Sequence, residues 1–193
     1  MDNKEFSKKF LDQVANLGQQ IDHNVLDGII TRLISLWKAR GWVYSIGNGG
    51  SASTASHFVC DLSKFVAPSG KRSFNALCLS DNISLFTAWA NDASFEEVYE
   101  KQVEGRLGPK DLLVTWSVHG GSGYSANLVR AVECARRQRC CTVSISGFDG
   151  GILHNQADYS LVVPIESTPH VEAMHLVLEH LICSRIKLLL SEI

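Results

Sequence analysis

The sequence predicts one α/β domain built on a parallel sheet of five strands. Three observations predict it: the chain has 193 residues, five short apolar segments alternate with helical patterns, and glycine-rich loops follow two of those segments. A chain of this length fits one domain with a sizeable core. Strands that alternate with helices form a parallel sheet through right-handed crossovers. We therefore expect a single domain over residues 1–193, with the sheet flanked by helices.

Two helices are expected before the first strand, within residues 1–40. Apolar side chains recur at helical spacing from Phe6 to Trp37. Such an amphipathic pair buries its apolar stripe on the domain itself or on another copy of the chain, and we favour another copy. Residues 1–40 are thus predicted to serve oligomerisation, and residues 41–193 to form the α/β core.

The core elements follow in a regular order. Apolar runs predict strands at 42–46, 74–79, 111–117, 141–145 and 159–164. Helical patterns and caps predict helices at 51–65, 83–90, 95–105, 126–138 and 168–190, the last being a long C-terminal helix. Two clusters of breaking residues, at 67–71 and 147–151, are expected to form turns.

Composition and charge exclude several classes of partner. The net charge is −2 and the pI is about 6.4, so the chain has no basic field to hold nucleic acid. No run reaches the roughly 20 apolar residues of a membrane span, and the polar N-terminus has no signal-peptide core. The six cysteines form no Cys-x-x-Cys pair, which favours reduced thiols and a cytoplasmic protein.

Two glycine-rich loops are the candidate ligand sites. Gly47-Asn48-Gly49-Gly50-Ser51 follows the first strand, and a loop from Ser117 to Ser125 follows the third. A strand, a glycine turn and a helix start suit a phosphate, although an ordinary tight turn has the same pattern. The first loop matches neither the dinucleotide fingerprint nor the P-loop fingerprint. Because both emerge at the carboxyl edge of a parallel sheet, where ligands bind, an anionic ligand is favoured.

Two helices carry side chains suited to proton transfer or metal binding. His57 and Asp61 lie four residues apart and face the same way, although a surface pair has the same spacing. Glu172, His175 and His180 crowd the last helix, where a polar helix end is the alternative. Glu172 and His180 are separated by a rise of about 12 Å, so they hold one ion only in a distorted turn or from different copies. His175 and His180 point about 140° apart, so one of them is expected to be structural.

These motifs together resemble the sugar isomerase (SIS) domain family. The resemblance rests on Gly47 to Ser51, on Ala55-Ser56-His57-Phe58, on Asn91-Asp92, on the Ser117 loop, on Gly147 to Gly151 and on the Glu172 to His180 helix. It covers nearly the whole chain, and within the family it is strongest to the branch that interconverts sedoheptulose 7-phosphate and glycero-manno-heptose 7-phosphate. It implies a flavodoxin-like sandwich, a homotetramer with active sites at subunit interfaces, and a Zn²⁺ ion, with other divalent metals as alternatives.

The resemblance also implies roles for individual residues. The metal ligands would be His57, Asp61, Glu172 and His180, with Asp61 and His180 as the base and acid of an enediol mechanism. Contacts with the phosphosugar would come from Asn48, Gly49, Gly50, Ser51, Asn91, Asp92, Ser117, His119, Ser122, Ser125 and Glu172.

Three departures from the family pattern stand out. Asp61 replaces a Glu, Glu172 replaces a Gln, and the Ser117 loop is about three residues longer. The first two changes keep oxygen ligands for a metal. The third leaves open the identity of the sugar, so the alternatives are an isomerase of another phosphosugar or a non-catalytic SIS-type protein that binds a partner protein or senses a sugar phosphate.

Overall fold

The computed structural model of the chain describes residues 1–67 and 70–192, so Pro68 and Ser69 of the predicted turn at 67–71 lie outside the described residues. Five strands form one parallel sheet in the order β2-β1-β3-β4-β5. They are β1 (Trp42–Gly47), β2 (Asn75–Cys78), β3 (Leu112–Ser117), β4 (Cys141–Gly147) and β5 (Tyr159–Val163). The predicted five-stranded parallel sheet is confirmed.

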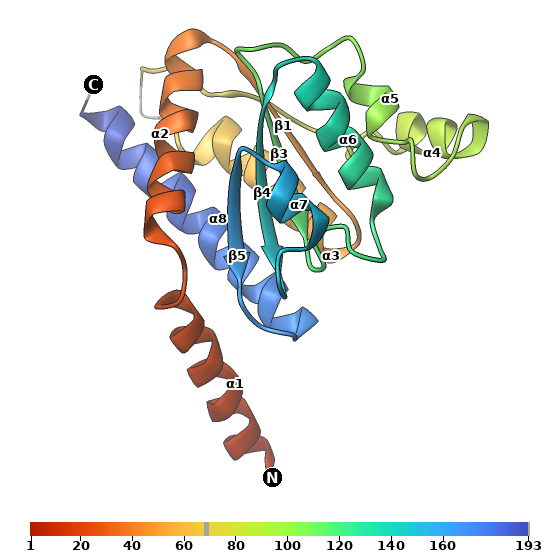
Figure 1. Cartoon of the computed structure of the whole chain (residues 1–193). Helices are drawn as coiled ribbons and strands as arrows, with labels where there is room; N and C mark the ends of the chain where they lie inside the picture. The colour runs from red at the N-terminus through yellow and green to blue at the C-terminus, as the bar shows by residue number, and fades with distance from the viewer. Residues whose placement is uncertain (68–69, 193) are drawn as a thin grey trace.

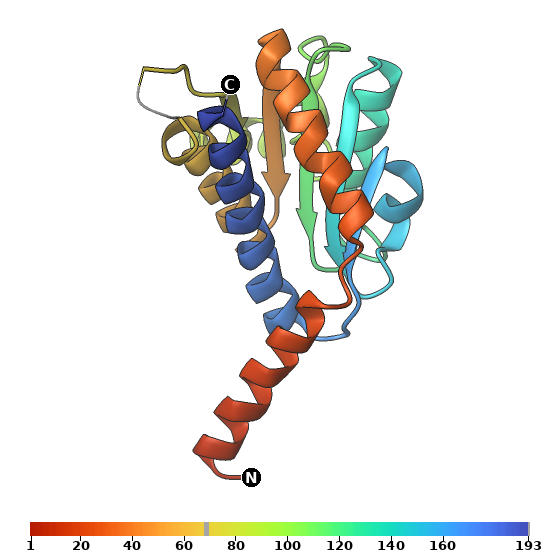
Figure 2. The same cartoon turned by 90° about the vertical axis from the view of Figure 1, so that its left-hand side faces the viewer.

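Helices cover both faces of the sheet, as Figures 1 and 2 show. One face carries α2 (His23–Ala39), α3 (Gly50–Cys60) and the long α8 (Thr168–Ser191), which packs against α3. The other face carries α4 (Ile83–Asp92), α5 (Glu100–Val103), α6 (Ala126–Arg137) and α7 (Gly151–Gln156). The long C-terminal helix is thereby confirmed.

The molecule has two separate hydrophobic cores, one on each face of the sheet. Leu112 and Val114 of β3 face the core under α3 and α8, whereas Leu113 between them faces the core under α6. All three are essentially excluded from solvent. Side chains of successive strand residues point to opposite faces, so a strand buried on both sides reads as a continuous apolar run.

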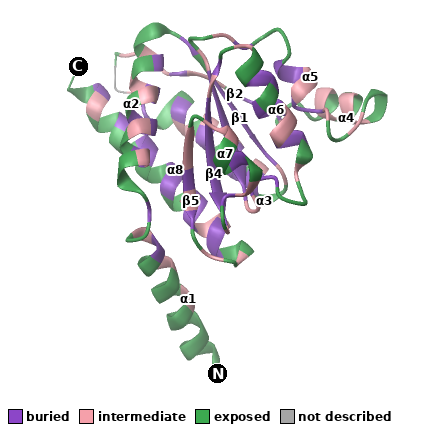
Figure 3. Ribbon diagram, viewed as in Figure 1, coloured by how far each residue is buried: buried purple, intermediate pink, exposed green. Residues whose placement is uncertain are grey.

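The first helix, α1 (Asn3–Gly18), extends away from this body (Figures 1 and 3). Only Leu17 in it is buried, while Phe6 and Leu11 are 56% and 66% exposed. Phe10 anchors the helix to the body, because its ring stacks on that of His170 with the centroids 4.0 Å apart. The predicted use of residues 1–40 in oligomerisation stays a prediction that this exposed apolar surface favours.

Two segments differ from their predicted elements. The helix expected at 95–105 is reduced to α5, and residues 95–99 form turns instead. Glu97 of these turns and Glu100 of α5 lie 3.1 and 2.9 Å from the Arg130 guanidinium, which holds the segment in this shape. The second is α7, a helix that the sequence pattern does not predict. Gly150 and Gly151 have φ values of +86° and +58°, which glycine adopts easily, so the predicted turn leads directly into a short helix that begins at Gly151.

No helix in the described part of the chain is long and apolar enough to cross a membrane. All six cysteines are free thiols, and four of them, Cys78, Cys134, Cys140 and Cys183, are buried.

Candidate active site

The two glycine-rich loops meet at the carboxyl edge of the sheet, because β1 and β3 are neighbours. The Asn48 amide of the first loop donates to Ser125 Oγ at 3.0 Å and to Asn127 Oδ1 at 2.9 Å. Asn127 returns a hydrogen bond to Asn48 Oδ1 at 2.9 Å. The predicted convergence of the loops is confirmed, and the buried Asn127, which follows the Ser125 position, is a contact that the sequence analysis did not single out.

The first loop turns sharply into α3. Gly49 has a φ of +55°, and among the described residues no side chain caps the helix, so its first N–H groups face the loop. A cavity of about 660 Å³ opens here. Its lining includes Asn48 and Gly49 of the loop, Ser53 and Ser56 of α3, and Asp81 and Phe86 on the opposite side.

The second loop is fixed from both ends. Gly120, with a φ of +56°, approaches the turn after β4 so closely that an added Cβ would lie 1.9 Å from the carbonyl oxygen of Gly150. The His119 ring lies between Phe148 and Tyr124, with centroids 4.4 and 5.0 Å away. Ser125 has a φ of +59°, a conformation that costs energy in residues with a side chain. Such strain is typical of positions held for a functional reason.

The remaining predicted contacts differ in their accessibility. Ser51 and Ser117 are buried, whereas Ser122 is exposed and Ser125 lines a second cavity of about 350 Å³. At the end of α4, Asn91 and Asp92 are exposed and joined by a hydrogen bond of 2.8 Å. Ser122 and Ser125 are therefore better placed than Ser117 to reach a ligand of this chain.

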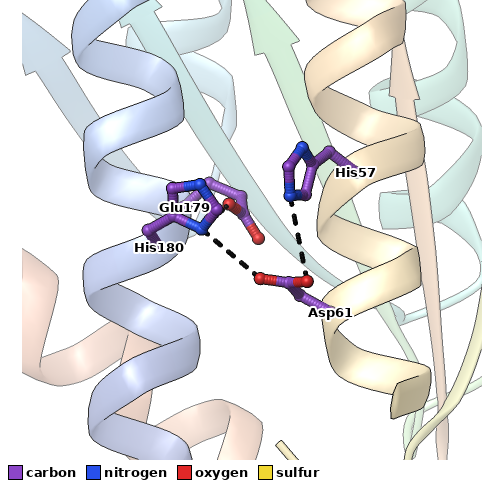
Figure 4. Close-up of side chains that lie close together, drawn as sticks. All are labelled: His57, Asp61, Glu179 and His180. Atoms are coloured by element: carbon purple, nitrogen blue, oxygen red, sulfur yellow. Dashed lines mark ion pairs between the residues drawn. The ribbon is translucent and has the colours of Figure 1, made fainter. Parts of the chain in front are cut away.

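Four side chains from α3, its continuation and α8 come together (Figure 4). The ligand atoms of His57, Asp61, Glu179 and His180 all lie within 4.8 Å of one another. Asp61 Oδ1 is 3.8 Å from His57 Nε2, and Asp61 Oδ2 is 3.4 Å from His180 Nδ1. Two imidazoles and two carboxylates are ligands that Zn²⁺ and other divalent transition metals accept. Three of the four ligands predicted from the sequence are thus brought together.

A change in helix geometry occurs at Asp61. The five residues Asp61–Phe65 form a π-helix, η1, which continues α3 and in which the Val66 N–H donates to the Asp61 carbonyl at 3.0 Å. Single π-turns inside helices are frequently found at functional sites. The sequence predicts a continuous helix here, because no residue type marks a π-turn.

Glu179 is the member of the group that the sequence analysis missed. It is fully buried, and Glu179 Oε2 lies 3.0 Å from His180 Nδ1. Burial, and next the charge of Asp61, raise the pKa of its carboxyl group above the ordinary value. The signal available in the sequence was its position directly before His180, one turn after His175.

Glu172 lies outside this group, near the start of α3. An added Cβ at Gly50 would lie 2.3 Å from Glu172 Oε1, so the carboxylate covers the first turn of that helix. Within one chain the structure therefore separates Glu172 from His57, Asp61 and His180, as the rise along α8 led us to expect.

His175 is the structural histidine of α8. It is fully buried, and its ring packs edge-on against Trp116 at 5.7 Å. Burial lowers its pKa from 6.5 to about 4. The prediction that His175 and His180 do not face the same site is confirmed.

The buried His175 should make the fold less stable in mild acid. Its ring stays neutral in the folded protein until about pH 4, whereas in the unfolded chain it takes up a proton near pH 6.5. The unfolded state therefore binds more protons between these values, and stability falls as the pH is lowered through that window. We expect urea unfolding of the wild type to lose about 2 kcal/mol more between pH 7 and pH 5 than that of His175→Gln. Equal losses in the two proteins would contradict the buried neutral ring.

Known proteins resemble the chain in sequence. The SIS domain family model matches residues 9–147. The phosphoheptose isomerase of Helicobacter pylori (strain P12) is 34% identical over 185 residues, which cover 96% of this chain and 90% of that protein. The lincomycin biosynthesis protein LmbN of Streptomyces lincolnensis is 44% identical over 158 residues, or 78% of this chain, and the match spans 58% of LmbN.

Solved structures resemble the chain in fold. Phosphoheptose isomerase GmhA from Neisseria gonorrhoeae superposes with a TM-score of 0.83 at 26% identity, covering 95% of this chain and 97% of that one. A phosphoheptose isomerase from Francisella tularensis gives 0.84 at 23% identity, with 95% of each chain covered. The chain therefore belongs to the SIS domain family and, within it, resembles the phosphoheptose isomerases.

Proposed function

We propose that the protein is an aldose–ketose isomerase that interconverts sedoheptulose 7-phosphate and glycero-manno-heptose 7-phosphate. The observation that carries the proposal is the meeting of His57, Asp61 and His180. His57 lies on α3, which also lines the 660 Å³ cavity through Ser53 and Ser56. Asp61 lies on η1, which continues α3, and His180 lies on the neighbouring α8. The relatives named phosphoheptose isomerase support this choice of substrate.

The reaction needs a base and an acid on neighbouring carbons of the sugar. In this proposal Asp61 removes the proton from the carbon beside the carbonyl group, and His180 exchanges a proton with the enediol. Their closest atoms, Asp61 Oδ2 and His180 Nδ1, are 3.4 Å apart, so both groups can reach the same part of one sugar. A bound divalent metal, which we take to be Zn²⁺, would be held by His57, Asp61 and His180 and would polarise the sugar oxygens.

The phosphosugar is assigned to the two loops. Asn48, Gly49, Gly50 and Ser51 would contact the sugar phosphate at the start of α3, and Ser117, Ser122 and Ser125 with His119 would bind it from the second loop. The reciprocal amide pair of Asn48 and Asn127 supports this, because it fixes the distance between the loops.

Assembly would complete the site. Asn91 and Asp92, which resemblance assigns to the sugar hydroxyls, lie exposed on α4, and Phe6 and Leu11 expose apolar surface on α1. We propose a cytoplasmic homotetramer in which neighbouring copies cover α1 and bring such residues, together with Glu172, to shared sites.

The experiment is to incubate purified, metal-analysed protein with sedoheptulose 7-phosphate and to follow the aldose heptose 7-phosphate by NMR. We expect conversion that stops on chelation and returns with Zn²⁺. Metal-loaded tetramer that converts nothing would contradict the proposal.

An isomerase of a different phosphosugar is the second candidate. The 44% identity to LmbN and the long loop with the 67% exposed Tyr124 favour it, because this loop is assigned to the substrate. Profiling ketose phosphates of different chain length by NMR separates the two candidates. A purely binding SIS-type protein would explain neither the buried carboxylate nor the two histidines beside Asp61.

A further inference from the structure

Glu179 occupies an unusual position for a carboxylate. Its side chain is completely buried, whereas those of His57, Asp61 and His180 are 43%, 14% and 51% exposed. Oε1 accepts a weak hydrogen bond from Cys183 Sγ at 3.5 Å. His180 Nδ1 is 3.0 Å from Oε2, but no described group donates a well-directed hydrogen bond to that atom. A buried carboxylate without such a partner is costly unless a cation balances it.

The direction of the side chain identifies where that cation would lie. Figure 4 shows the Glu179 carboxylate turned toward the space between Asp61 and the two imidazoles. A divalent ion there would receive two nitrogen and two oxygen ligands, and the charges of Asp61 and Glu179 would together balance its own.

We infer that Glu179 is the fourth ligand of the metal, so that one chain supplies the whole set: His57, Asp61, Glu179 and His180. The inference rests on the proposed function only for the presence of a metal. It differs from the assignment by resemblance, in which Glu172 is the fourth ligand.

Glu172 has a different explanation within the chain. Its carboxylate lies over Gly50 at the N-terminus of α3, where the helix dipole stabilises a negative charge. From there it faces the loop that holds the substrate in the proposed function. It is therefore placed to contact the substrate and not to bind the metal of its own chain.

The experiment compares Glu179→Gln with Glu172→Gln, two isosteric changes on the same helix. Each protein, stripped of metal, is titrated with Zn²⁺ by calorimetry, and its thermal midpoint is recorded with and without the ion. Removing a residue that only hydrogen-bonds to a metal ligand already weakens metal binding by about 10–100-fold. Removing a ligand itself, as Glu179→Gln would, should therefore weaken Zn²⁺ binding by at least about tenfold. Glu172→Gln should bind like the wild type.

The thermal midpoints show whether a loss of Zn²⁺ binding is caused by a destabilised fold. Because Glu179→Gln removes a buried charge, the metal-free variant should melt at or above the wild-type temperature, while the rise on adding Zn²⁺ should shrink. The inference is overturned if Glu179→Gln binds like the wild type, if Glu172→Gln is the variant that loses the ion, or if the wild type binds none. NMR conversion of sedoheptulose 7-phosphate by the same wild-type sample reports on the proposed function separately.

Discussion

Asp61→Asn should lower kcat for sedoheptulose 7-phosphate by at least about a hundredfold, the usual contribution of a general base. The amide keeps the size of the side chain but cannot take up the proton that leaves the sugar carbon. Asp61 also lies 3.8 Å from His57 and 3.4 Å from His180, so the change removes the charge at the centre of the group. KM should change much less, because the loops around Asn48 and Ser125 are untouched.

Metal content must be measured in the same samples, because Asp61 is a proposed ligand as well as the proposed base. Excess Zn²⁺ that restores full occupancy should leave kcat low. Asp27→Asn is the matched control, since it removes the same charge from an exposed position on α2. Turnover by fully metal-loaded Asp61→Asn near the wild-type rate would exclude Asp61 as the base.

The sequence was most informative where a physical pattern is strict. Strands buried on both faces give continuous apolar runs, so β1, β3 and β4 were predicted almost to the residue. Local sequence patterns predicted the wrong secondary structure where tertiary contacts determine the conformation. The segment at 95–105 has helical periodicity, but it forms mostly turns because Glu97 and Glu100 are held by Arg130 of α6.

The candidate site shows the same division. Spacing on α3 predicted the pair of His57 and Asp61, and helix geometry correctly separated Glu172 from His180 in one chain. The sequence did not predict a role for Glu179, because periodicity alone does not reveal that its carboxylate is buried against α3 and not exposed to solvent. That fact depends on the packing of α8 on α3, two helices more than a hundred residues apart in the sequence.

Trp116→Ala should destabilise the fold by about 3–5 kcal/mol, the usual cost of deleting a buried aromatic side chain. Trp116 is fully buried on β3, and its Nε1–H donates to Ser45 Oγ at 3.1 Å. Alanine would leave both a large cavity and an unpaired buried hydroxyl group. Urea unfolding measures the loss, and Trp42→Ala, at a site 43% exposed, should cost far less. Similar costs at the two positions would contradict the central role of Trp116.

Trp116 also lies between the two helices that carry the metal group. Its ring lies 5.5 Å from that of Phe58 on α3 and 5.7 Å from that of His175 on α8, measured between centroids. Phe58 is the neighbour of His57 in the sequence, and His175 lies one helical turn before Glu179. If the ring sets the spacing of α3 and α8, its loss should weaken Zn²⁺ binding as well as stability. Trp116→Phe, which keeps an aromatic ring, should retain most of both. A variant that unfolds more easily but binds Zn²⁺ as the wild type does would show that the helices hold their spacing without this ring.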